Sequence, residues 1–546
     1  MRALSLGTAA AIAAALAAFP FVVTSPYYIH LLMVIAIYAI LVLGLDIVVG
    51  YTGEVSLGHA ALFGIGAYAA GMMKFQFGIS TGLGVWLAIP AGIAAAALFG
   101  LVLALPALRV TGPYLAMVTL AFGTIVQILI NEMVFLTNGP MGIPLRRPAL
   151  FPDLVKLVNR DVQFYYLVVI LLGLSVLVVN RVLKSHLGRA FEALRDSPIA
   201  SDCMGVSVYR YKVYAFVISA GMAGLAGALF TYSEQYISPN TYSFELTILF
   251  LLAVTLGGRK SRLGPILGAA IIVLLPNILA DIQLFRILAG MVSAAALAVL
   301  AAAWIRRAAN RRQILVPAVL CAAFFPFSLM LESVTDYRLT LFGVMILFVV
   351  YYLPDGLVGF LRGRAATLLP RRAALKADAS RGDVWGARPA APTAEPLLSV
   401  EGLVMMFGGL RALNHVDLAV RAGTIHGLIG PNGSGKSTMM NVLSGIYRPT
   451  QGRVALGGQP IAGLSPAGIA GKGIARTFQN VQLFGEMTAL ENILVGLHHG
   501  YRSGFPGIVL GTPGYRREEQ AARDRALGIL EFVGLGALAL EEARNL

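Results

Sequence analysis

"GLIGPNGSGKSTMMNVLSG", residues 427–445, contains the motif that decides the fold of the last third of the chain. Residues 430–438 fit the pattern G-x-x-x-x-G-K-[ST] at every position. Glycines in such a loop let the backbone curl until its N–H groups point inward around phosphate oxygens. We therefore predict a phosphate-binding loop between a strand and a helix, where the helix N-terminus favours an anion.

This loop predicts a site for ATP and Mg²⁺. Lys436 is expected to reach the β- and γ-phosphates, and Ser437 is expected to ligate the metal ion. The loop residues expected to contact the nucleotide are Gly430, Pro431, Asn432, Gly433, Ser434, Gly435, Lys436, Ser437 and Thr438.

The sequence before the loop has the composition of a membrane protein. Of the 546 residues, 58% are hydrophobic and 13% are charged, whereas an ordinary soluble protein carries about 25% charged residues. A helix needs about 20 apolar residues to cross a bilayer. Ten to twelve membrane spans are predicted, since the run 244–257 is short enough to be re-entrant. The candidates are 5–23, 28–49, 57–73, 84–107, 113–136, 163–183, 213–232, 244–257, 264–283, 287–305, 314–331 and 339–357.

The positive charges predict the orientation of these spans. If every span crosses, fifteen Lys and Arg residues lie in loops on the side of both termini, and seven lie on the other side. The side richer in Lys and Arg is normally cytoplasmic. We therefore expect a multi-pass membrane protein, surrounded by lipid, with its N-terminus and its nucleotide site in the cytoplasm. No block of the chain is basic enough to indicate a nucleic-acid partner.

The composition changes after residue 360. Residues 361–396 are rich in Ala, Arg and Pro and predict a cytoplasmic linker. Beyond it, alternating strands and helices predict an α/β domain. The expected fold is a polytopic all-α membrane domain over 1–360, then the linker, then a partial α/β P-loop domain over 397–546. The expected elements are strands at 397–407, 423–430, 452–456 and 473–478 and a helix at 435–447.

The fuller form "GPNGSGKST" resembles the Walker A loop of ABC transporter ATPases, and "ARTFQNVQLFGEMTALENI" resembles their Q-loop. The resemblance implies that Gln479 contacts Mg²⁺ and the attacking water, and that Phe407 stacks on adenine. The alternatives are a solvated loop glutamine and a core aromatic. Among the histidines, His426 is expected in the core, and His498 and His499 are expected to be a solvated pair.

Other parts of the ABC ATPase pattern do not follow Gln479. The family carries a glycine-containing signature and then an apolar strand that ends in Asp-Glu. After Thr438 the only aspartate is Asp524, which no apolar run precedes. We therefore expect that residues 1–546 by themselves cannot hydrolyse ATP, and that the natural chain continues beyond Leu546.

The membrane part resembles the LivM-type permease of branched-chain amino acid ABC importers, and the ATPase part resembles the LivG-type subunit. The permease resemblance rests on "ILVLGLDIVVGYTGEVSLGHAALFGIGAYAA", "RVTGPYLAMVTLAFGTIVQILINEMVFLTNGPMGI", "GRAFEALRDSPIASDCMGVSVYRYKVYAFVISAGMAGLAGAL" and "LGGRKSRLGPILGAA". It implies an ATP-driven importer with a LivH-like second permease, a LivF-like second ATPase and a periplasmic or lipid-anchored substrate-binding protein. Residues 188–212 resemble the segment on which the ATPase docks, and we expect them to contact the ATPase part near Gln479.

Two alternatives stay open. Urea or short-amide importers have similar permeases, and a membrane-anchored P-loop NTPase without transport would share the loop, although an anchor needs only one or two spans. Polar groups within spans are costly and usually face a helix bundle or a pathway. The candidates to line such a path are Asp46, Glu54, His59, Gln127, Asn131 and Glu132.

Overall fold

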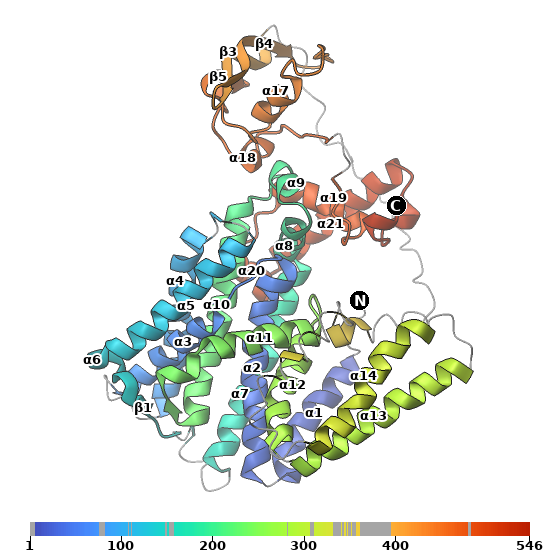
Figure 1. The fold of residues 1–546 in the computed structure, drawn as a ribbon. Helices are drawn as coiled ribbons and strands as arrows, with labels where there is room; N and C mark the ends of the chain where they lie inside the picture. The colour runs from blue at the N-terminus through green and yellow to red at the C-terminus, as the bar shows by residue number, and fades with distance from the viewer. Residues whose placement is uncertain are drawn as a thin grey trace. The chain divides into compact units, whose positions relative to one another are not determined.

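The computed structural model forms two compact units (Figure 1). The first comprises Met1–Gly50, Glu54–Leu177 and Phe216–Pro370, and the second comprises Tyr51–Gly53, Val178–Ala215 and Arg371–Leu546. The structure describes residues 6–23, 25–75, 82–107, 109–110, 112–147, 150–151, 158–280, 282–305, 311–330, 340, 343–344, 347, 351, 356–360, 395–478 and 482–546.

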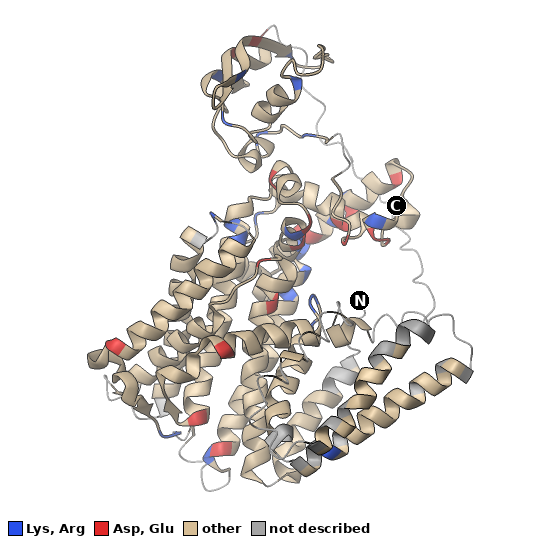
Figure 2. Cartoon of the chain, in the orientation of Figure 1, with Lys and Arg blue, Asp and Glu red and all other residues tan. Residues whose placement is uncertain are grey.

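Long apolar helices make up the membrane part. Five of the described helices are long and apolar enough to cross a membrane, and shorter apolar helices accompany them. Most of their length carries no charge in Figure 2. The helices are α1 (Leu6–Val22), α2 (Pro26–Asp46), α3 (His59–Phe75), α4 (Gly82–Ala107), α5 (Pro113–Glu132), α7 (Arg160–Lys184), α10 (Val208–Glu234), α11 (Phe244–Gly257), α12 (Gly264–Ala280), α13 (Ile282–Ile305) and α14 (Arg311–Met330).

Eleven of the twelve expected spans coincide with these helices, and the twelfth, 339–357, lies mostly outside the described residues. Short elements join the helices. They are the π-helical turn η1 (Ile47–Tyr51), α6 (Val134–Thr137), η2 (Gly139–Met141), β1 (Ile143–Pro144), β2 (Tyr236–Ile237) and η4 (Pro239–Tyr242). The number of helices that cross the membrane stays a prediction.

Three glycines let helices α3, α4 and α10 pack backbone against backbone. A Cβ atom on Gly66 would lie 2.5 Å from the Cα atom of Gly224, and one on Gly224 would lie 2.3 Å from the carbonyl oxygen of Gly92. Both distances are too short for any side chain. Small residues at such crossings are how helices approach closely in lipid, as the glycine-rich runs of the sequence predict.

The second unit contains a small sheet and several helices. The sheet is antiparallel, in the order β4-β3-β5-β6. Its strands are β3 (Pro396–Phe407), β4 (Leu410–Arg421), β5 (Gln451–Leu456) and β6 (Gln459–Pro460). The helices are α8 (His186–Asp196), α9 (Pro198–Cys203), α17 (Lys436–Leu443), α18 (Pro466–Ala470), α19 (Ala489–Gly496), α20 (Phe505–Leu510) and α21 (Pro513–Phe532), with short turns η6 (His498–Gly500), η7 (Gly536–Leu538) and η8 (Ala543–Asn545).

The apolar face of α17 packs on this sheet. Met439 and Val442 of the helix share one buried cluster with Leu403 of β3, Leu413 of β4 and Val454 of β5. Burying a side chain of this size stabilises the fold by about 1.5–3 kcal/mol. The cluster therefore fixes the helix that follows the phosphate-binding loop. A helical membrane part followed by a strand-and-helix part confirms the expected fold class.

Two of the expected strands do not form. Residues 423–430 and 473–478 have no regular secondary structure, and Ile425 and Ile429 are almost fully exposed. A strand exists only when a neighbouring strand pairs with its backbone, and no described strand pairs with either segment. His426 lies in the first segment and is exposed, so the expectation of a core histidine is wrong.

Candidate functional site

The phosphate-binding loop has the backbone that its glycines predict. Gly433 and Gly435 have φ angles of 84° and 87°, a region that side chains with a Cβ rarely enter. At Gly435, a Cβ atom would also lie 2.7 Å from the carbonyl oxygen of Ala412 and 2.8 Å from the Leu413 side chain. Only glycine therefore allows the loop to turn into α17 while it lies this close to β4.

Lys436, the first residue of α17, folds back into the loop. Its ammonium group donates hydrogen bonds to the carbonyl oxygens of Gly430 at 2.7 Å and of Pro431 at 2.8 Å. The loop is therefore wrapped around one positive charge. The first N–H groups of a helix have no partner within it, so charge and N–H groups meet at one end of α17. These residues fit a phosphate group.

The two other nucleotide candidates have different outcomes. Phe407 ends β3, is 41% exposed, and meets the Tyr447 ring edge-on at 5.1 Å between ring centroids. Its ring is thus supported from one side and open to a stacking partner. Gln479 lies outside the described residues, so its role stays a prediction.

Arg476 is a residue that the sequence analysis missed. Its guanidinium donates to Asn441 Oδ1 at 2.6 Å and to Ser444 Oγ at 2.8 Å, and it lies over the Phe478 ring. These bonds tie the segment just before Gln479 to the end of α17. The signal was an arginine in an expected strand, but its partners lie more than thirty residues away.

Helices α8 and α9 form an apolar contact with the ATPase-like part of the chain. One buried cluster unites Leu194 of α8 and Ala200 of α9 with Phe484, Met487 and Val495. Phe484 is fully buried. We expected residues 188–212 to contact the segment around Gln479. This contact is confirmed for the described residues before and after Gln479, such as Phe478 and Phe484.

Polar bonds surround this apolar contact. They run along both helices and do not depend on a single residue. The Arg189 side chain pairs with Glu519 of α21, and Arg195 with Glu486 at 3.3 Å. Further bonds join Ser197 to Gln482 (2.9 Å), Asp196 to the backbone N–H of Glu486 (3.2 Å) and Asp202 to the backbone N–H of Ala467 (3.3 Å).

Two buried histidines lie beside the Arg189 ion pair. The His186 ring stacks on Tyr501 at 4.6 Å, and His498 Nε2 lies 2.5 Å from the Tyr211 hydroxyl. Burial and the charge of Arg189 lower the pKa of His186 to about 4. Burial, with smaller effects of His186 and Arg189, lowers the pKa of His498 to about 3. Both rings are neutral at pH 7.

The expected solvated pair of histidines is thus half wrong. His499 is exposed, but His498 is only 7% exposed. The sequence could not show this, because burial of His498 depends on Tyr211 and His186, which lie about three hundred residues away in the sequence.

The candidate path residues fall into two groups. Asp46, Glu54 and His59 are buried, whereas Gln127, Asn131 and Glu132 are partly or fully exposed. His59 lies 2.9 Å from Ser56 Oγ and 2.7 Å from Ser219 Oγ through its two ring nitrogens. Gln127 lines a cavity of about 20 Å³ at the start of α3, room for about one water molecule. A path through these residues stays a prediction.

The membrane helices match a known family. Residues 27–301, half of the 546-residue chain, match the model described as branched-chain amino acid transport system / permease component. The chain belongs to this permease family. Residues 413–545 match the ABC transporter model. The expected resemblance is confirmed: one chain joins a sequence of this permease family to a sequence that matches the ABC transporter model.

Individual relatives show the same division. The high-affinity branched-chain amino acid transport system permease protein LivM of Escherichia coli K12 is 39% identical over 274 residues, which are 46% of this chain and 63% of LivM. The ATP-binding protein LivG of the same organism is 48% identical over 152 residues, 28% of this chain and 60% of LivG. A nucleotide-free ATP-binding cassette from an ABC transporter is 37% identical over 28% of this chain and 59% of that chain, with a TM-score of 0.23. The chain thus spans less than two thirds of the relatives it matches.

Proposed function

We propose that the protein is a subunit of an importer that uses ATP to take up branched-chain amino acids. The observation that carries this proposal is the presence, in one chain, of a sequence from the branched-chain amino acid permease family and an ABC transporter sequence. Relatives of each part are named for branched-chain amino acid transport. The direct contact of helices α8 and α9 with the ABC-type part supports coupling between the two.

In this proposal the loop 430–438 holds the phosphates of ATP. Lys436 supplies positive charge to the phosphates, Ser437 ligates Mg²⁺, and Phe407 stacks on the adenine ring. Gln479 would add a ligand to Mg²⁺ and contact the attacking water. Mg²⁺ would neutralise charge on the phosphates when they are transferred. The loop geometry supports the roles given to Lys436 and Ser437, and the open face of Phe407 supports its stacking on adenine.

Motion at the nucleotide would reach the permease through α8 and α9. Arg476 fastens the segment before Gln479 to α17, and Phe478, two residues further on, packs against the same apolar cluster as Leu194. This short path of contacts would let closure of the site around ATP move the docking helices. Hydrolysis would then drive the permease through its cycle.

The proposal also covers the location of the protein, its division into domains and its partners. We place the protein in the bacterial inner membrane with both the N-terminus and the ATP-binding domain in the cytoplasm. The domains are a permease over 1–360, a linker over 361–396 and an ATP-binding domain over 397–546. The partners are a second permease, a second ATPase and an external substrate-binding protein.

Uptake by cells tests this function. A strain that lacks its own branched-chain amino acid uptake is given the complete transporter genes, and entry of labelled leucine, isoleucine and urea is followed. We expect energy-dependent entry of leucine and isoleucine, and no entry of urea above the background. Entry of urea without leucine would assign the protein to the urea and short-amide importers instead.

A further inference from the structure

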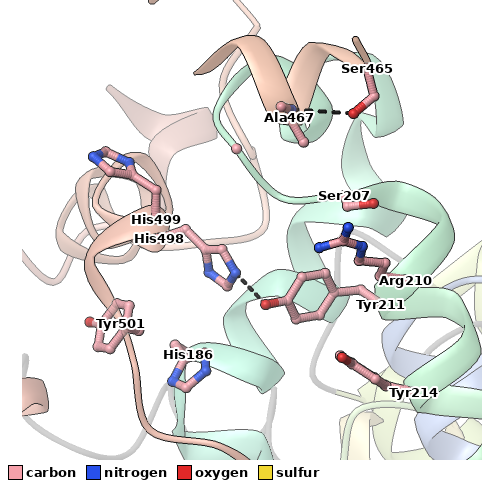
Figure 3. Close-up of a pocket in the computed structure, with 12 residues that line it drawn as sticks. His186, Ser207, Arg210, Tyr211, Tyr214, Ser465, Ala467, His498, His499 and Tyr501 are labelled. Atoms are coloured by element: carbon pink, nitrogen blue, oxygen red, sulfur yellow. Dashed lines mark hydrogen bonds between the residues drawn. The ribbon is translucent and has the colours of Figure 1, made fainter. Parts of the chain in front are cut away.

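A polar cavity of about 300 Å³ lies beside the docking contact. Its walls come from two regions that are far apart in the sequence (Figure 3). His186 of α8 and the residues around the start of α10 line one side, and the start of α18 and the turn η6 line the other. The lining residues are His186, Gly205, Ser207, Arg210, Tyr211, Tyr214, Ser465, Ala467, Gly468, His498, His499 and Tyr501.

The charge of this lining favours an anion. Arg210 is its one permanently charged side chain, and none of the lining residues is an Asp or Glu. Within the described part of the chain, the Arg210 guanidinium has no ion pair or hydrogen bond. In contrast, the nearby Arg189 is already paired with Glu519. Arg210 is therefore free to bind a carboxylate or phosphate through two parallel hydrogen bonds.

A second, independent feature points to a missing ligand. His186 is 6% exposed, and its Nδ1 atom has no hydrogen-bond partner in the described structure. Buried polar atoms normally have a partner, and leaving one without costs about 1–3 kcal/mol. The ring lines the cavity, so a ligand or a water molecule inside it could supply this partner. Ser207 and Ser465 add hydroxyl groups to the same lining.

We propose that this cavity binds a small oxyanion, a phosphate or a carboxylate, and that the bound anion strengthens the docking of the ATPase part on α8 and α10. A volume of about 300 Å³ is at the lower end for ligand pockets, which span about 300–1,000 Å³. A cavity of this size has room for a small anion together with water molecules. The anion would contact both walls at once, so its binding energy would add to that of docking. This site is separate from the phosphate-binding loop.

Binding of two probe ions to the full chain in lipid nanodiscs tests the proposal. Inorganic phosphate and acetate are titrated separately by calorimetry at constant ionic strength. Because the loop at 430–438 is a second phosphate site, every titration is repeated in a Lys436→Ala background. We expect saturable binding of at least one ion to persist there. Binding of phosphate alone or of acetate alone would identify the class of anion.

The variant Arg210→Gln removes the charge of the cavity and should weaken that binding on the order of ten- to a hundred-fold. Arg523→Gln on the exposed face of α21 is the matched control and should bind as the parent does. His186→Phe keeps a ring against Tyr501 but removes the nitrogen, and it should also weaken binding. The proposal is wrong if neither ion binds in the Lys436→Ala background, or if neither Arg210→Gln nor His186→Phe changes the affinity.

Discussion

The phosphate-binding loop and the docking contact are two functional regions that are built in opposite ways. The loop consists of nine consecutive residues, and its shape depends on backbone conformation at glycines such as Gly433 and Gly435. The docking contact unites α8 and α9 with residues about three hundred positions later and depends on side chains such as Arg189 and Phe484. A site made of consecutive residues can be predicted from a short motif, whereas the partners in a contact between distant segments become known only from the structure.

The difference predicts separate consequences of mutation. Damage to the loop should abolish ATP use and leave docking intact, whereas damage to the contact should leave nucleotide binding intact and uncouple it from transport.

The largest effect is expected for Lys436→Ala. This change removes the one charge that the loop encloses, and the loss of a single stabilising donor at a reacting group costs about 100- to 1,000-fold in rate. ATP-dependent leucine uptake by cells should therefore fall at least about 100-fold. Protein level in the membrane should not change, because the hydrogen bonds of the Lys436 ammonium group in the described structure all go to its own loop.

Lys472→Ala is the matched control for that experiment. Lys472 is an exposed lysine of the same unit whose side chain donates a hydrogen bond to Gln459. It should transport as the parent does. Equal uptake by the Lys436→Ala variant and the parent would show that this loop does not drive transport.

A smaller effect is expected for Arg189→Met, at the docking contact. It leaves the carboxylate of Glu519 partly buried without its partner, and removing one member of a buried ion pair costs about 3–5 kcal/mol. Transport should fall about ten-fold or more, while the affinity for labelled ATP should stay within about two-fold of the parent.

The double variant Arg189→Met with Glu519→Leu distinguishes two effects. One is loss of the ion pair itself, and the other is the cost of leaving Glu519 charged without a partner. Replacing both partners by apolar residues is often neutral, so the double variant should recover a large part of the lost transport. A double variant as impaired as the single one would mean that the ion pair itself is required.

The loop could be predicted from sequence because every requirement of its shape falls within residues 430–438. The helices of the membrane part were predictable for a similar reason, since apolar runs of sufficient length have few alternatives in lipid. Residues 188–212 could be identified as a docking segment by their resemblance to a known family. Their individual partners could not.

Two predictions from the sequence, a strand at residues 423–430 and a solvated His498, are wrong for the same physical reason. Residues 423–430 have the composition of a strand, yet no described strand pairs with them, and Ile425 and Ile429 are exposed. His498 sits in a polar stretch, yet Tyr211 and His186 enclose it. Both strand pairing and burial are set by distant segments, which local composition does not contain.

The pH dependence of stability is expected to be the smallest of these effects. The pKa values of His186 and His498 lie at about 4 and 3 in the folded protein, below the value of about 6.5 for an unfolded chain. At pH values between the folded and the unfolded pKa, the unfolded chain therefore binds more protons than the folded protein does. Stability is fully present above about pH 6.5 and falls as the pH drops toward 4, by on the order of 1 kcal/mol for each histidine at pH 5.5.

Denaturant unfolding at pH 7.5 and pH 5.5 measures this loss. The charged and titratable side chains that face the two rings are Arg189, Glu518, Glu519 and His499, together with Tyr211 and Tyr501. His498→Phe should reduce the difference in stability between the two pH values. His499→Phe should not, because His499 is exposed. An undiminished difference in the His498→Phe variant would refute the role given to His498.

We expect the ATPase-like part to dock on α8 and α9 of its own chain, and a disulfide crosslink measures this contact. The side chains of Ser197 and Gln482 meet at 2.9 Å. In a background with Cys203→Ser and Cys321→Ser, the pair Ser197→Cys and Gln482→Cys should crosslink within a single chain in membranes. The pair Ser197→Cys and Arg523→Cys should not. Absence of the first crosslink in folded, membrane-inserted protein would contradict the account.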